Sequence, residues 1–191
     1  LIENNDVSHF RLSFHLTLAL LILCLIFWFI LDLSNIRKFK IKISNLLLFF
    51  ILILILLQII LGAFLSGLDG GLIYNSWPDM NGAFFPNDVT INDYLSSQLF
   101  YNSSIIQFFH RIIAYILFFS IIFLNYSFFK NRLNFKSVLI FDIAILLQIF
   151  LGIITLVSGV EIKYASLHQL GSIFVLSSYL LILYKNPNQQ L

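Results

Sequence analysis

Five apolar runs, each long enough to cross a lipid bilayer, alternate with polar segments along the chain. They cover residues 12–33, 44–66, 105–129, 137–158 and 164–184. A helix needs about 20 predominantly apolar residues to cross the hydrocarbon core, and its backbone must bond within the segment because lipid offers no partners. The pattern therefore predicts an all-α membrane protein with five transmembrane helices. None of the short alternating strands of a transmembrane barrel occurs.

Charged residues divide the polar segments into two classes. Those after the first, third and fifth runs are basic, with Arg37, Lys38, Lys40, Lys42, Lys130, Arg132, Lys136 and Lys185. The long segment 67–104 has no Lys or Arg, and its charged residues are Asp69, Asp79, Asp88 and Asp93. Because short loops rich in Lys and Arg stay inside a membrane, we predict that the N-terminus lies outside and the C-terminus inside.

Composition supports a chain solvated by lipid. Hydrophobic residues make up 60% of it and charged residues 10%, whereas a soluble domain is roughly half apolar and a quarter charged. The single cysteine, Cys24, excludes an internal disulfide and a cysteine-based metal site. The chain begins with Leu1, and its first residues lack the basic region of a signal peptide, so we expect a fragment or a processed product.

A seven-residue motif occurs twice. Residues 56–62 read LLQIILG and residues 146–152 read LLQIFLG, so six of the seven positions match. Each copy lies in the outer half of an outward-running helix and is followed by an outer loop and an inward-running helix with a histidine in its first turns. The first run resembles the second part of this unit, with His15 in place of His168. Repeated pairs of membrane helices commonly enclose a site between them.

Three histidines, His15, His110 and His168, open the first, third and fifth helices at similar depth. An ionisable residue within a span indicates function by default, and imidazole is the commonest metal ligand. Histidines on facing helices of a bundle can hold a haem iron from both sides. His110 and His168 are the natural pair, because the last four helices can form one complete four-helix haem-binding bundle. The alternative is a hydrogen bond to a carbonyl group or a place at the interface.

The remaining polar residues of the spans have two interpretations each. Arg111 can pair with a haem propionate or anchor the helix at the interface. Gln58 and Gln148 can bond across the bundle or lie near the edge of the macrocycle. His9 is predicted to be a solvated loop residue. Close approach of helices or of a flat macrocycle is favoured by the small residues Gly62, Gly152 and Gly171.

The segment 67–82 resembles the outer-loop signature of the haem A synthase family. The matching positions are Gly67, Leu68, Gly71, Tyr74, Asn75, Trp77, Pro78, Met80 and Gly82. Residues 58–63, 107–111 and 167–169 also resemble the family, so the similarity covers nearly the whole chain. Some family members carry cysteine pairs in their outer loops, and this chain has no cysteine there.

The resemblance implies an architecture. Family members have eight transmembrane helices in two related four-helix halves. By this resemblance, residues 1–42 are the last helix of the N-terminal half-bundle plus a basic inner loop. Residues 43–191 are the C-terminal four-helix haem b bundle, with its outer loop at 67–104.

The resemblance also implies roles for the histidines. The second half of the family binds haem b through two axial histidines, which match His110 and His168 as ligands of the haem iron. His15 matches one axial ligand of the substrate haem, whose other ligand would precede Leu1. We therefore expect no catalytic residue within this fragment.

The activity implied is oxidation of the C8 methyl of haem O to a formyl group, which makes haem A, with haem b relaying electrons. The fragment is expected to be incomplete for catalysis. The alternatives are a b-type cytochrome that carries electrons in the membrane and a membrane scaffold or small transporter. Expected partners are haem O, membrane lipid, haem O synthase and a second copy of the chain, and no nucleic acid. The expected location is the bacterial cell membrane or the mitochondrial inner membrane.

Overall fold

A computed structural model describes residues 8–133 and 135–187 of the chain. It contains five long helices, α1 (His9–Leu33), α2 (Asn45–Gly67), α4 (Ser103–Lys130), α5 (Lys136–Val157) and α6 (Ile162–Lys185). Each is long and apolar enough to cross a membrane. The prediction of an all-helical integral membrane protein with five spans is therefore confirmed.

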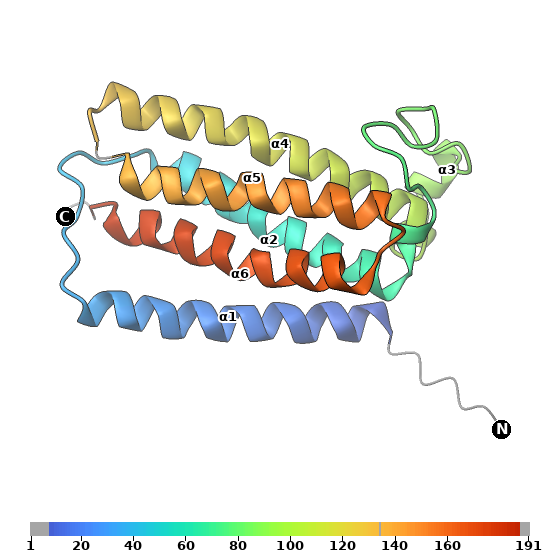
Figure 1. Ribbon diagram of the computed structural model, residues 1–191, viewed down its shortest axis with the longest axis horizontal. Helices are drawn as coiled ribbons and strands as arrows, with labels where there is room; N and C mark the ends of the chain where they lie inside the picture. The colour runs from blue at the N-terminus through green and yellow to red at the C-terminus, as the bar shows by residue number, and fades with distance from the viewer. Residues whose placement is uncertain (1–7, 134, 188–191) are drawn as a thin grey trace.

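The long helices lie side by side, and their connections gather at two opposite ends (Figure 1). One end carries the segment 68–102 and is called the loop end; the other carries residues 34–44, 131–133 and 135 and is called the basic end. Helices α1, α4 and α6 run from the loop end to the basic end, and α2 and α5 run back. Packing is closest within the pairs α5–α6, α2–α4 and α1–α2, and sparse between α4 and α5.

The apolar core fills the half of the bundle nearer the basic end. Its fully buried members include Ile51, Leu124, Phe128, Phe141 and Ile182. These come from α2, α4, α5 and α6, so all four helices share one core. Dispersion contacts of this kind hold membrane helices together, since lipid provides no hydrophobic driving force between them.

Between this core and the loop end, each of the four helices has a stretch without a buried side chain. Over residues 56–62, 108–116, 146–157 and 162–174, all of them described, no side chain is fully buried. A closely packed bundle buries one face of each helix along its whole length. We call these four segments the half-buried layer, and both His110 and His168 belong to it.

The segment at the loop end is ordered by short elements. It contains two 3-10 turns, Gly70–Leu72 and Ser97–Phe100, and the short helix α3 (Ile91–Tyr94). A reciprocal capping box between Thr90 and Asp93 starts α3. The side chain of Asn102 accepts hydrogen bonds from the first amides of α4 and so caps that helix.

Candidate functional site

His110 lies near the start of α4 and contacts α2. Its Nε2 is 3.0 Å from the side-chain nitrogen of Gln58. A methyl group at Gly62 would lie 3.2 Å from the Cε1 atom of the ring. The other ring nitrogen, Nδ1, is buried and has no hydrogen-bond partner within the described chain. The imidazole therefore packs on α2 with one nitrogen unsatisfied.

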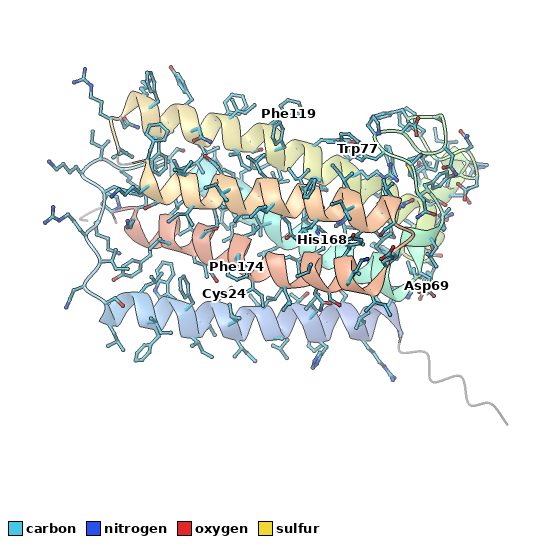
Figure 2. The ribbon with its side chains drawn as sticks, viewed as in Figure 1. Cys24, Asp69, Trp77, Phe119, His168 and Phe174 are labelled. Atoms are coloured by element: carbon cyan, nitrogen blue, oxygen red, sulfur yellow. The ribbon has the colours of Figure 1, made fainter. Side chains whose placement is uncertain are left out.

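His168 has the corresponding place on α6 and contacts α5. In Figure 2 it lies among the helices, in the half of the bundle nearer the loop end. A methyl group at Gly152 would lie 3.0 Å from its Cε1 atom. The side chain of Gln148 donates a 2.6 Å hydrogen bond to the backbone carbonyl of His168. The Nδ1 atom of His168 is again buried, with no partner in the part of the chain that is described.

The two histidines share two features. Metal-bound imidazoles almost always use their second nitrogen in a hydrogen bond, and here a nitrogen of each ring is buried without one. Both rings lie in the half-buried layer, where side chains leave the bundle incompletely packed. Among residues 8–133 and 135–187, no cluster of three or more His, Cys, Asp or Glu could hold a metal ion. Two imidazoles suit the axial positions of an iron that a macrocycle already holds.

His15 and His9 differ from this pair. His15 is exposed on α1, so the described chain does not bring it to His110 or His168. His9 is the first residue of α1 and is 7% exposed. Its ring contacts the rings of Phe64 and Tyr101 at centroid distances of 5.4 and 5.2 Å. The prediction that His9 is a solvated loop residue is wrong, because aromatic rings from distant parts of the sequence cover it.

Arg111 holds the loop end against α4. Its guanidinium donates hydrogen bonds to the carbonyl oxygens of Tyr74 at 3.0 Å, Ser76 at 3.1 Å and Asp79 at 2.6 Å. Gln107, one turn earlier on α4, donates a further bond to Tyr74 O at 2.9 Å. Within the guanidinium of Arg111, the Nε atom is the one that is buried without a partner in the described residues. These contacts hold the outer-loop signature, residues 67–82, against the start of α4; we call this segment the loop motif. The arginine that makes them directly follows His110 in the sequence.

The same motif is also attached to α5. The side chain of Asn75 donates hydrogen bonds to the carbonyl oxygens of Gly71 at 2.8 Å and of Leu156 at 2.9 Å. A methyl group at Gly71 would lie 2.7 Å from the Cγ2 atom of Val160. The position needs glycine because Val160, in the turn between α5 and α6, occupies that space. The motif therefore bridges the two helix pairs that carry His110 and His168.

A carboxylate ties the second part of the loop to α4. Asp88 accepts hydrogen bonds from the hydroxyl of Tyr74 at 2.5 Å and from that of Ser104 at 2.6 Å. Burial raises the pKa of Asp88, but the hydrogen bonds from Ser104 and Tyr74 lower it by more than burial raises it. The net pKa therefore lies below the ordinary value. The carboxylate is therefore charged at neutral pH and stabilises the loop there.

A comparison with known families agrees with this arrangement. The family model COX15-CtaA, described as a cytochrome oxidase assembly protein, matches residues 1–180. The chain belongs to this family. It is similar to a haem A synthase of Pelagibacter ubique (strain HTCC1062), with 74% identity over 188 residues that cover 98% of this chain and 56% of that protein.

More distant relatives share the name. A haem A synthase of Wolbachia pipientis wMel is 36% identical over 96% of this chain and 52% of its own length. One from Rickettsia bellii (strain OSU 85-389) is 38% identical over 93% of this chain and 54% of its own length. The chain spans about half the length of these curated relatives.

For this COX15-CtaA family member, sequence reasoning found the histidines but not their surroundings. The glycines of the repeat were expected to admit close approach, and the structure assigns them specific partners, the rings of His110 and His168. The bonds from Arg111 to the loop were missed, since no pattern joins an arginine to carbonyl groups about thirty residues earlier. Whether Arg111 also pairs with a propionate stays a prediction.

Proposed function

We propose that this chain is the haem b-binding part of a haem A synthase. Helices α2, α4, α5 and α6 would form the haem bundle, with His110 and His168 as the two axial ligands. The observation that carries this proposal is the pair of buried, partnerless imidazole nitrogens in the half-buried layer. Family membership and the names of the relatives support it.

The division of the chain follows from the same proposal. Residues 43–191 would be the haem b bundle with the loop 67–104, and residues 1–42 would provide the last helix of a preceding half-bundle. His15, exposed on α1, would bind the substrate haem from that side, together with a ligand that these residues do not include. The basic end would face the inside of the cell membrane.

The overall reaction would convert the C8 methyl of haem O to a formyl group. A haem b held by His110 and His168 would supply one-electron transfer. The protein residues would bind the haem and orient its ligands, since Gln58 and Gln148 contact the two histidines. Arg111 and the loop motif lie at the loop end of the bundle, next to the half-buried layer.

The ligand assignment is tested by spectroscopy of the chain expressed in membranes with a supply of haem. We expect a reduced b-type spectrum from the purified chain and its loss in His110→Ala and His168→Ala. His15→Ala is the matched control and should keep the haem, because His15 lies outside the bundle. Haem that survives both substitutions in the bundle contradicts the assignment.

The reaction itself needs a longer chain. A chimera can join the upstream part of the Pelagibacter relative, 74% identical over the shared region, to residues 1–191. In cells that make haem O, the pyridine haemochrome spectrum should show haem A, and His110→Ala in the chimera should abolish it. Haem b binding without any haem A would favour the alternative, a b-type cytochrome that carries electrons.

A further inference from the structure

In both copies of the repeated motif the final glycine lies against a histidine ring. Gly62 ends the first copy and lies against the ring of His110; Gly152 ends the second and lies against the ring of His168. In each case the histidine comes from the next long helix along the chain, α4 for Gly62 and α6 for Gly152, so the contact is tertiary. The glycine at the end of the repeated motif thus contacts a histidine from another helix in both copies.

The contacts are tight enough that a methyl group at either glycine would displace the neighbouring ring by a few tenths of an ångström. A methyl group at Gly152 would lie 3.0 Å from Cε1, 3.5 Å from Nδ1 and 3.6 Å from Nε2 of His168. At Gly62 it would lie 3.2 Å from Cε1 and 3.8 Å from Nδ1 of His110. Carbon atoms pack best at about 3.5–4.0 Å, so a side chain at either position would push the ring away from its place.

The glutamine four residues before each glycine contacts the same histidine. Residues four apart share one face of a helix, which places Gln58 beside Gly62 and Gln148 beside Gly152. Gln58 bonds to the ring of His110 and Gln148 to the backbone carbonyl of His168. Both glutamines keep a buried Oε1 atom without a partner in the described chain.

We propose that each Gln–Gly pair is a histidine seat that fixes the plane of one imidazole ring. The first seat is Gln58 with Gly62 and the second is Gln148 with Gly152. The glycines act as positioning residues: they let each ring lie on the backbone of the neighbouring helix, and so set the angle between the two axial ligands. This inference rests on the proposed haem site and explains why the motif is repeated.

A purely structural role makes a different prediction. If the glycines only allowed helices to pack, alanine would weaken folding and leave any bound haem unchanged. If they position the rings, alanine leaves the helices intact, since it favours a helix more than glycine does, and alters the haem. The g values of a low-spin ferric haem depend on the angle between its imidazole planes, so they separate the two roles.

The experiment compares Gly62→Ala and Gly152→Ala with Val157→Ile, a control that adds one methyl group at an exposed position of α5. We expect both alanine variants to accumulate with changed g values and a shifted midpoint potential. Haem affinity should fall roughly 10- to 100-fold, as for other changes next to metal ligands. The effect should be larger for Gly152→Ala, whose contact is tighter, and Val157→Ile should match the wild type.

Some results would count against the seats, and another would count against the proposed haem site. Alanine variants with wild-type g values and potential overturn the inference. So does the failure of both to accumulate while Val157→Ile accumulates, because that assigns the glycines to helix packing. If the wild type binds no haem, the proposed function fails instead. The seats are then tested by NMR, which should detect the Cε1 proton of His168 next to the Gly152 α-protons in selectively labelled protein. Absence of that contact refutes them.

Discussion

Replacing Arg111 with alanine should release the loop motif from α4 without unfolding the bundle. The substitution removes three hydrogen bonds, to the carbonyl oxygens of Tyr74, Ser76 and Asp79. A hydrogen bond from a charged donor contributes about 1.5–3 kcal/mol, but the bond to Asp79 is exposed and solvent weakens it. We therefore expect the closed state of the loop motif to be destabilised by about 3 kcal/mol. That is equivalent to roughly a 100-fold increase in the equilibrium constant for opening of the loop.

Hydrogen exchange measures this opening directly. The amides of Met80 and Asn81 are bonded to Ala83 O and to the Ser76 hydroxyl, both at 2.7 Å. In haem-free protein, the peptide covering residues 74–83 should exchange about 100-fold faster in Arg111→Ala.

Two comparisons sharpen this test. Arg111→Lys should recover less than half of the protection, because lysine keeps the charge but lacks the planar fork. The control Arg37→Ala removes an exposed arginine from the segment at the basic end and should change nothing in the loop. Exchange of residues 74–83 that stays within twofold of the wild type in Arg111→Ala would refute the reasoning, and would assign loop closure to Gln107 and Asn75.

Two further outcomes follow from the polar contacts. Because the folded pKa of Asp88 is lowered, its stabilisation of the loop is fully present above the unfolded pKa of about 3.9 and is lost as pH falls through the folded pKa. The protection factors of the loop amides, each taken relative to the intrinsic exchange rate at the same pH, should therefore fall below about pH 4. A loop with the same pH response in Asp88→Asn would exclude this carboxylate as the cause. Tyr179→Phe removes the 2.5 Å bond from the buried hydroxyl to Leu48 O and should cost about 1 kcal/mol. That corresponds to about 2–4 °C in thermal unfolding in detergent, and an unchanged midpoint would show that the bond contributes nothing.

The loop motif has a structural role besides its value as a family signature. Tyr74 and Asn75 connect it to both helix pairs, through Arg111 on α4 and Leu156 on α5. Since contact between α4 and α5 is itself sparse, the motif joins the helices that carry the two histidines at the loop end.

The sequence alone predicted the helices well. The run 105–129 became α4 (Ser103–Lys130) and the run 137–158 became α5 (Lys136–Val157). The reason is physical: in lipid, the length of an apolar run and the need to bond the backbone internally determine the element. The common depth of His15, His110 and His168 stays a prediction from their positions near the starts of three helices.

What the tertiary structure decided is which residues meet. His9 is buried because Phe64 and Tyr101 approach it from other elements. Gln58 and Gln148 hold identical places in the repeat, yet one contacts a ring and the other a backbone carbonyl. Helical periodicity gives the face on which a residue lies, but the atom opposite depends on how neighbouring helices are rotated and shifted, which packing alone determines.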